Sequence, residues 1–174
     1  MEELMLLQPD ETMLDEINAY RQAMLDADSS MDGAGPLRQL EAKDWLRATR
    51  SLLVEETCPP QWVPATQFVC IRKTDGRIVG MIQVRHRFND YLAEYGGHIG
   101  YSVHPDERRK GYATWMLAHV LPEAKKLGLN RVLVTCDEDN EASRRTILNN
   151  GGLFDRNTWL EDEKQTVSRY WIDL

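Results

Sequence analysis

The spacing of apolar residues is most regular between residues 113 and 127. Apolar side chains recur there every three or four positions, at Ala113, Met116, Leu117, Val120, Leu121, Ala124 and Leu127. This period predicts an amphipathic helix with one face against a core. Gly128 should end the helix in the left-handed conformation. Pro122 should kink it without breaking it, because the apolar stripe continues beyond that residue.

Extended runs and further periodic segments flank this helix. Strands are expected at 4–7, 68–72, 78–88, 98–103, 131–136, 153–154 and 167–172. The Asp75-Gly76 pair is typical of a hairpin between the second and third of these. Helices are expected from Asp10 to about residue 25, over about 38–55, and over 141–150. The order of elements predicts an α/β fold, with a mixed sheet and helices on both faces.

Two loops and one strand carry further expectations. The segment 27–36 is rich in turn residues, and three prolines in 57–64 exclude regular structure there. Trp62 in the second loop is either a buried plug or part of a substrate wall, and we expect the plug. In the strand over 78–88, Ile82 and Val84 share one face with His86 and Phe88, whereas Arg85 and Arg87 lie on the other.

A basic turn precedes the helix over 113–127 and has the chemistry of an anion site. The first amides of a helix have no internal partner and carry the positive end of the helix dipole. Gly111 would let this backbone approach a diphosphate, Ala113 adds little bulk, and Arg108, Arg109 and Lys110 supply charge. The alternative is a solvated basic turn without a ligand, because such short glycine motifs are weak by themselves.

Residues 98–151 resemble the acetyl-coenzyme A core of the GNAT superfamily of N-acetyltransferases. In that family an [Arg or Gln]-x-x-Gly-x-[Gly or Ala] turn binds the coenzyme A pyrophosphate, and Arg108, Gly111 and Ala113 fill its fixed places. Val103-His104-Pro105 resembles the end of the family's fourth strand, and Asn140 resembles the Asn that opens the helix after the fifth strand. The resemblance implies about seven mostly antiparallel strands, splayed between the fourth and the fifth.

The resemblance also implies a division of labour along the chain. We expect one acetyltransferase domain over 1–174, with 98–151 as the acetyl-CoA core and 1–66 on the substrate side. The pantetheine arm would lie along the backbone of the fourth strand. The predicted cofactor-binding residues are Tyr101, Ser102, Val103, Arg108, Arg109, Lys110, Gly111, Tyr112, Ala113, Asn140 and Ser143. Asn140 has a second reading, as the N-cap of the helix that follows it.

The catalytic groups are less well defined. Some family members carry a Glu on the fourth strand as the general base, whereas this chain has His98 nearby, whose ordinary pKa near 6.5 suits proton removal from an ammonium. Glu94 is the second candidate and His86 the third, and His98 could equally be a structural histidine. Many members place a Tyr acid where this chain has Ile147. Tyr101 or Tyr112 could serve as that acid, or the thiolate could leave unassisted.

Composition narrows the class of protein. The chain has 174 residues and a net charge of −7, which disfavours nucleic acid as a partner. Residues 1–66 hold 13 acidic and 5 basic side chains, a net charge of −8, whereas residues 67–174 are nearly balanced at +1. An acidic rim favours a cationic acceptor. No apolar run suggests a membrane span, and the first residues lack the basic region of a signal peptide, so we expect a cytoplasmic protein.

Cysteine usage and the motifs together lead to one expected activity. Three widely spaced cysteines argue against a disulfide framework and against a zinc site, so no metal is expected. The sequence predicts an acetyl-CoA-dependent N-acetyltransferase acting on a small-molecule amine or on a protein N-terminal or lysine amine. The alternative is an acyl-CoA sensor or scaffold without turnover. A nucleotide-phosphate site is disfavoured, because the turn lacks the P-loop spacing. Pairing of two chains through the last strands, as a homodimer, is left open.

Overall fold

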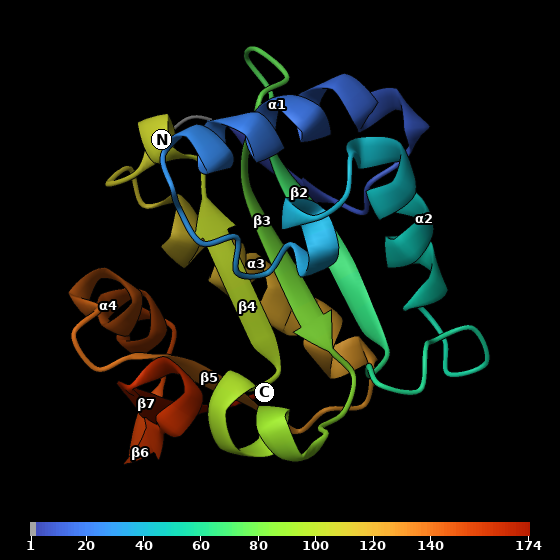
Figure 1. The fold of residues 1–174 in the computed structure, drawn as a ribbon. Coiled ribbons are helices and arrows are strands. Elements are labelled where there is room, and N and C mark those ends of the chain that lie inside the picture. Colours follow the sequence, from blue (N-terminus) through green and yellow to red (C-terminus); the bar gives the residue numbers. More distant parts are fainter. Residues whose placement is uncertain (1–2) are drawn as a thin grey trace.

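A seven-stranded sheet forms the centre of the molecule (Figure 1), in a computed structural model that describes residues 3–174. The strand order is β1-β2-β3-β4-β5-β7-β6. All neighbours are antiparallel except β4 and β5, which are parallel. The strands are β1 Leu4–Leu7, β2 Ala65–Arg72, β3 Ile78–Arg85, β4 Ile99–Val103, β5 Arg131–Asp137, β6 Leu153–Leu160 and β7 Gln165–Asp173. The predicted mixed, mostly antiparallel α/β fold is therefore confirmed.

Helices cover both faces of this sheet. Figure 1 shows α1 (Leu14–Asp26) and α2 (Ala42–Ser51) in front of it and α3 (Tyr112–Lys126) behind it. The helix α4 (Glu141–Asn149) contributes Ile147 to the core on the α3 side. Each face has its own core, because strand side chains alternate: Phe68 and Cys70 pack on the α3 side, whereas Val69 packs under α1 and α2.

Several local predictions are confirmed. Asp10 begins the first helical segment by accepting a hydrogen bond from the amide of Thr12 at 2.9 Å. α3 runs through Pro122 without a break, and Gly128 follows it with a φ of +93°. Cys70 and Cys136 are buried in strands, as expected for small core residues.

Other predictions need correction. β3 ends at Arg85, three residues earlier than expected, because the amide of His86 leaves the ladder and donates to the carbonyl of Pro64. β6 is longer than predicted, and its edge position leaves Leu153 and Phe154 exposed. The helix expected over 38–55 covers only Ala42–Ser51. Trp62 is 59% exposed, so the prediction of a buried plug is wrong.

The loop after α1 crosses β4 at closest range where two glycines meet. A β-carbon on Gly33 would lie 2.1 Å from the carbonyl oxygen of Gly100, and Gly33 has a φ of +73°. Only glycine satisfies both conditions. The first third of the chain is thereby held directly against the middle of the sheet, beside the point where β4 and β5 separate.

Candidate active site

The turn that enters α3 exposes the first amides of the helix. The chain passes through a 3₁₀ turn at Pro105–Glu107, and the left-handed conformations of Arg109 (φ 64°) and Gly111 (φ 82°) then reverse it into α3. Gly111 is the N-cap residue and has no side chain with which to cover the amides that follow. The first turn of α3 therefore keeps the unpaired donors and the positive dipole end that bind an anion.

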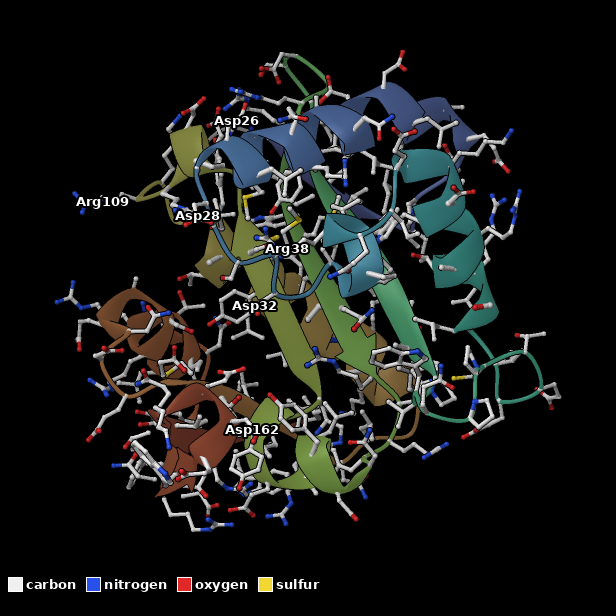
Figure 2. The ribbon with its side chains drawn as sticks, in the orientation of Figure 1. Asp26, Asp28, Asp32, Arg38, Arg109 and Asp162 are labelled. Carbon is white, nitrogen blue, oxygen red and sulfur yellow. The ribbon has the colours of Figure 1, made fainter. Side chains whose placement is uncertain are left out.

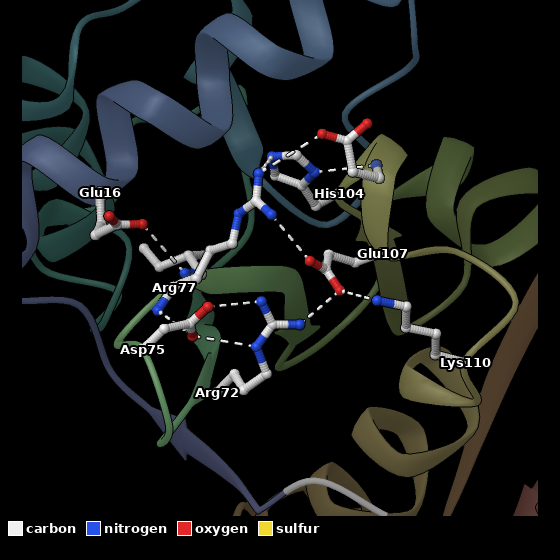
Figure 3. A network of polar contacts seen from close by, with 9 residues as sticks. Glu16, Arg72, Asp75, Arg77, His104, Glu107 and Lys110 are labelled. Carbon is white, nitrogen blue, oxygen red and sulfur yellow. Dashed lines mark hydrogen bonds and ion pairs between the residues drawn. The ribbon is translucent and has the colours of Figure 1, made fainter.

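A buried carboxylate fixes the shape of this turn (Figure 3). Glu107 is 3% exposed and accepts from Arg72 Nη1 and Lys110 Nζ, both at 2.7 Å, and from Arg77 Nη1 at 2.9 Å. Burial by itself would raise the pKa of Glu107, but the hydrogen bonds from Lys110 and Arg72 outweigh it and hold the pKa near 2. The turn is thus tied to the β2–β3 hairpin by charge.

The three basic residues of the turn have different surroundings. Lys110, which we predicted to bind the cofactor, directs its ammonium to Glu107. Arg108 donates from Nη2 to Ser29 Oγ at 2.7 Å and from Nε to the carbonyl of Val103 at 3.3 Å. Arg109 projects outward from the turn (Figure 2). The structure thus brings Arg108 to the end of β4, whereas Lys110 stabilises the turn.

The backbone of β4 lacks a partner on one side. The only register pair between β4 and β5 is Ile99 with Val134. From Gly100 to Val103, β4 continues to pair with β3, while its other edge faces the gap. An extended chain with amide groups could lie along this edge. This opening is the splay predicted between the fourth and fifth strands.

Side chains from β4 and α4 meet at the mouth of this gap. Tyr101 Oη lies 2.6 Å from Ser143 Oγ. The side-chain oxygen of Asn140 accepts from the amide of Ser143 at 3.1 Å, which confirms its N-cap reading. Ser102 points to the opposite face, where its Oγ lies 2.8 Å from the hydroxyl of Tyr20. Tyr101 and Asn140 therefore both contact Ser143, and cofactor binding by these three residues stays a prediction.

Tyr112 and Ile147 both face the core. The side chain of Tyr112, the first residue of α3, is buried in the core, so only its backbone can meet a ligand at the turn. Ile147, at the position where many family members have a Tyr, is fully buried and offers no proton. Burial also raises the pKa of Tyr101 above its ordinary value.

His98 is held by the backbone of the neighbouring strand. Its Nδ1 accepts from the amide of Leu133 at 2.9 Å, and its ring, 6% exposed, lies 4.0 Å from the ring of Phe88. Burial first, and the nearby charge of Arg85 second, lower its pKa to about 4. Because the acceptor nitrogen is occupied, these contacts favour a structural role, and catalysis by His98 stays a prediction.

The other two candidate bases also have partners. Glu94 forms paired 2.8 Å hydrogen bonds with Arg156 and accepts from Thr158 at 2.6 Å. The bonds from Arg156, followed by that from Thr158, lower the pKa of Glu94 to about 2. His86 lies 2.8 Å from the hydroxyl of Thr66, and burial lowers its pKa. Each of the three candidate bases thus has a hydrogen-bond partner and a pKa below its ordinary value.

A cavity of about 810 Å³ opens on the α1–α2 side of the sheet. It is lined by the loop after α1, by one side of α2, by the loop that carries Trp62, and by the end of β3 and the segment after it. Its charged lining residues are Asp32 and Arg85. Neither residue was predicted as part of a site, and the only signal for Arg85 was its place on the strand face opposite Ile82 and Val84.

Two residues that line the cavity, Gly33 and Arg85, lie against β4 beside the gap. A β-carbon on Gly100 would lie 3.1 Å from Arg85 Nη2 and 3.0 Å from the amide nitrogen of Gly33. Gly100 follows Ile99, the last residue that pairs with β5. A molecule in the cavity and a chain in the gap would therefore approach each other at this point of β4.

Residues 3–174 contain neither a candidate metal site nor a candidate membrane-spanning helix. No group of three or more His, Cys, Asp or Glu side chains is arranged to hold a metal ion. None of the helices there combines the length and the apolar composition that a bilayer crossing requires.

Comparison with solved structures gives similar folds over nearly the whole chain. A ribosomal-protein-S5-alanine acetyltransferase from Vibrio fischeri has a TM-score of 0.75 at 14% identity, over 99% of this chain and 94% of that one. A ribosomal-protein alpha-N-acetyltransferase in complex with coenzyme A has a TM-score of 0.70 at 14% identity, over 98% and 94%. The GNAT domain of an S. lividans protein gives 0.66 at 14% identity, over 97% and 89%.

Sequence comparison assigns the family where these distant structures show only the fold. Among curated proteins, none matches the chain. The family model described as "Acetyltransferase (GNAT) family" matches residues 36–151, which include β4, the turn before α3, and α4. The match covers most of the chain and the whole of the predicted donor region. The chain therefore belongs to the acetyltransferase (GNAT) family.

Proposed function

We propose that this protein transfers the acetyl group of acetyl-CoA to a primary amine, by direct attack while both substrates are bound. One observation carries the proposal: Gly33 and Arg85, which line the cavity on the α1–α2 side, lie against Gly100, the residue at which β4 parts from β5. Two substrates that enter from the two sides would place a thioester and an amine against the same strand. Such positioning supplies much of the rate of an acyl transfer.

The residues of the donor region fit coenzyme A. The pyrophosphate would lie on the amides from Gly111 to Ala113, including that of Tyr112, with charge from Arg108 and Arg109. Lys110 would act mainly through its bond to Glu107. Bound acetyl-CoA supplies an activated acetyl thioester.

The pantetheine arm would lie along the free edge of β4. Tyr101, Ser102 and Val103 would bind it through their backbone, and a backbone amide of this strand would donate to the thioester oxygen. Asn140 and Ser143 would border the arm at the start of α4.

Asp32 is the carboxylate that lines the acceptor cavity. It would attract the ammonium form of the acceptor, in keeping with the net charge of −8 over residues 1–66. His98 and Glu94 stay predictions as general bases, since each would have to release a hydrogen-bond partner first.

Two measurements test the proposal. Calorimetric titration with acetyl-CoA should show saturable binding, and release of the coenzyme A thiol should follow when an acceptor amine from a broad panel is added. Gly111→Ala should weaken acetyl-CoA binding, because a methyl group would intrude among the helix amides. Gly151→Ala is the matched control: its φ of +85° matches the 82° of Gly111, and a β-carbon there meets nothing within 4 Å. Equal acetyl-CoA affinity in both variants would refute the binding of the pyrophosphate to the amides from Gly111 to Ala113.

A second candidate function rests on Ile147. Because its side chain is buried and cannot protonate a leaving thiolate, the fold could bind an acyl-CoA without turnover. Saturable acetyl-CoA binding with no thiol release from any amine of the panel would favour this binding role. Thiol release with even one amine supports the enzyme.

A further inference from the structure

Arg85 is a cation without a carboxylate partner in the acceptor cavity. It forms no ion pair with any residue from 3 to 174, and its only hydrogen bonds run from Nη1 to the carbonyls of Gly96 and Gly97, at 3.3 and 3.5 Å. Other arginines of the sheet are differently placed. Arg72 binds Asp75 and Glu107, and Arg169 binds Asp155 at 3.0 Å.

The remaining nitrogens of Arg85 are not sealed within the protein. Over the described chain, no side-chain nitrogen or oxygen is sealed from solvent without a hydrogen-bond partner. Nε and Nη2 of Arg85 have no hydrogen-bond partner among the described residues, so both are accessible to solvent, and the residue lines the cavity. Burial lowers the pKa of this guanidinium, against the opposing influence of the Asp32 carboxylate. A half-buried guanidinium that has lost part of its hydration and has no ion-pair partner is strongly stabilised by an anionic ligand.

The geometry favours a planar, two-oxygen anion. An arginine with Nε and Nη2 both free presents two parallel donors, which match the two oxygens of a carboxylate. Asp32 lines the same cavity and offers the opposite charge. A cavity of about 810 Å³ is of the size that encloses small molecules.

We infer that the acceptor is a small amine that also carries a carboxylate, and that Arg85 binds this carboxylate while Asp32 faces the ammonium. The inference deepens the proposed function and rests on it for the identity of the reacting amine. It also explains why a cavity in the acidic part of the molecule contains a cation: the two charges orient a zwitterion. Arg85 is then a specificity-determining residue.

The test compares amino acids with their amides as acceptors, using thiol release with acetyl-CoA. In the wild-type protein, kcat/KM should be higher for the best amino acid than for its amide. In Arg85→Met, kcat/KM for the amino acid should fall about 100-fold through KM, while that for the amide changes less than about threefold. Arg85→Lys keeps the charge without the paired donors, so its kcat/KM for the amino acid should lie between those of the wild type and Arg85→Met.

Arg87→Met is the matched control. Arg87 lies two residues further along, is exposed, and pairs with Glu55 outside the cavity, so its loss should leave both acceptors unchanged. An equal fall in kcat for amino acid and amide in Arg85→Met would overturn the inference, because it would mean that Arg85 stabilises the reacting carbonyl or the fold. An unchanged preference would overturn it too, as would activity confined to peptides.

Failure of the proposed function gives a different result. If no amine releases thiol, amino acids and amides are titrated calorimetrically into the coenzyme A complex of wild type and Arg85→Met. Tighter binding of the amino acid that disappears in Arg85→Met sustains the carboxylate site even without turnover. Equal binding of acid and amide refutes it.

Discussion

The donor side and the acceptor side of the site use charge in opposite ways. On the donor side, the turn over 104–113, Glu107 is surrounded by Arg72, Arg77 and Lys110, so the charges stabilise the shape of the turn. On the acceptor side, the cavity that contains Asp32 and Arg85, the guanidinium has no such partner. Charges satisfied within the protein build a binding surface, whereas an unpaired charge is available to select the ligand.

The largest expected effect comes from the contact that joins the two sides. Gly33→Ala would place a β-carbon 2.1 Å from the carbonyl oxygen of Gly100, in a left-handed conformation. We expect a loss of about 3 to 5 kcal/mol in the free energy of unfolding, measured by urea denaturation. Gly76→Ala has a similar φ of +70° and nothing within 4 Å, so it should cost about 1 kcal/mol. Equal losses would show that the loop can move aside.

Loss of the donor-side carboxylate should come next. Glu107→Gln leaves Arg72, Arg77 and Lys110 facing a neutral amide, and we expect about 3 kcal/mol of destabilisation in urea, with weaker acetyl-CoA binding by calorimetry. The exposed Glu161, which pairs with Lys164, is the control, and Glu161→Gln should leave both measurements unchanged. Unaltered acetyl-CoA affinity in Glu107→Gln would show that the ion pairs of Glu107 are not needed to hold the amides from Gly111 to Ala113 in their binding conformation.

His98 should make stability depend on pH. Its folded pKa of about 4 lies below the ordinary 6.5, so below pH 6.5 the unfolded chain takes up a proton that the folded protein rejects. Between pH 6.5 and pH 4 this group should cost about 2 to 3 kcal/mol of stability. His98→Asn, whose side-chain oxygen can accept from the amide of Leu133, should show a flatter curve in urea denaturation at a series of pH values. Parallel curves for the two proteins would contradict the assignment.

The smallest effect is expected at Asp32. Asp32→Asn should lower kcat/KM about tenfold for every ammonium acceptor, with or without a carboxylate, in the thiol-release assay. Asp162→Asn makes the same change of net charge on the turn between β6 and β7. Asp162 does not line the cavity and lies apart from Asp32 (Figure 2), so its exchange should have no effect. A selective loss for carboxylate acceptors at Asp32 would mean that the two charged residues have exchanged roles.

The sequence predicted the donor side better than the acceptor side. Gly111, Arg108 and Ala113 lie within six residues, and Asn140 caps the helix that it opens, so local spacing carried the information. The same local signals located the strands, and errors fell at ends such as Arg85, where a tertiary hydrogen bond to the chain at Pro64 ended the ladder.

The acceptor side could not be predicted in the same way. Asp32 and Arg85 are brought together by the crossing of Gly33 over Gly100, a contact between backbones 67 residues apart that leaves no trace in the periodicity. The usual tendency of aromatic side chains to be buried gave a wrong prediction in the same region. Trp62, in a proline-rich loop, was expected to be enclosed, but it lines an open cavity. The partners of His98 and Glu94 also come from distant strands.

The close contact between Gly33 and Gly100 limits how this protein can be engineered toward new acceptors. The loop from Met31 to Pro36 borders the cavity and invites randomisation, but position 33 has no room for any side chain. Libraries should keep Gly33, and also Met31 and Ala34, whose side chains are buried in the core under α1 and α2. Asp32 and Gln39 have exposed side chains that line the cavity and can be exchanged without disturbing the crossing, but exchange of Asp32 also removes the carboxylate that we assign to the acceptor ammonium.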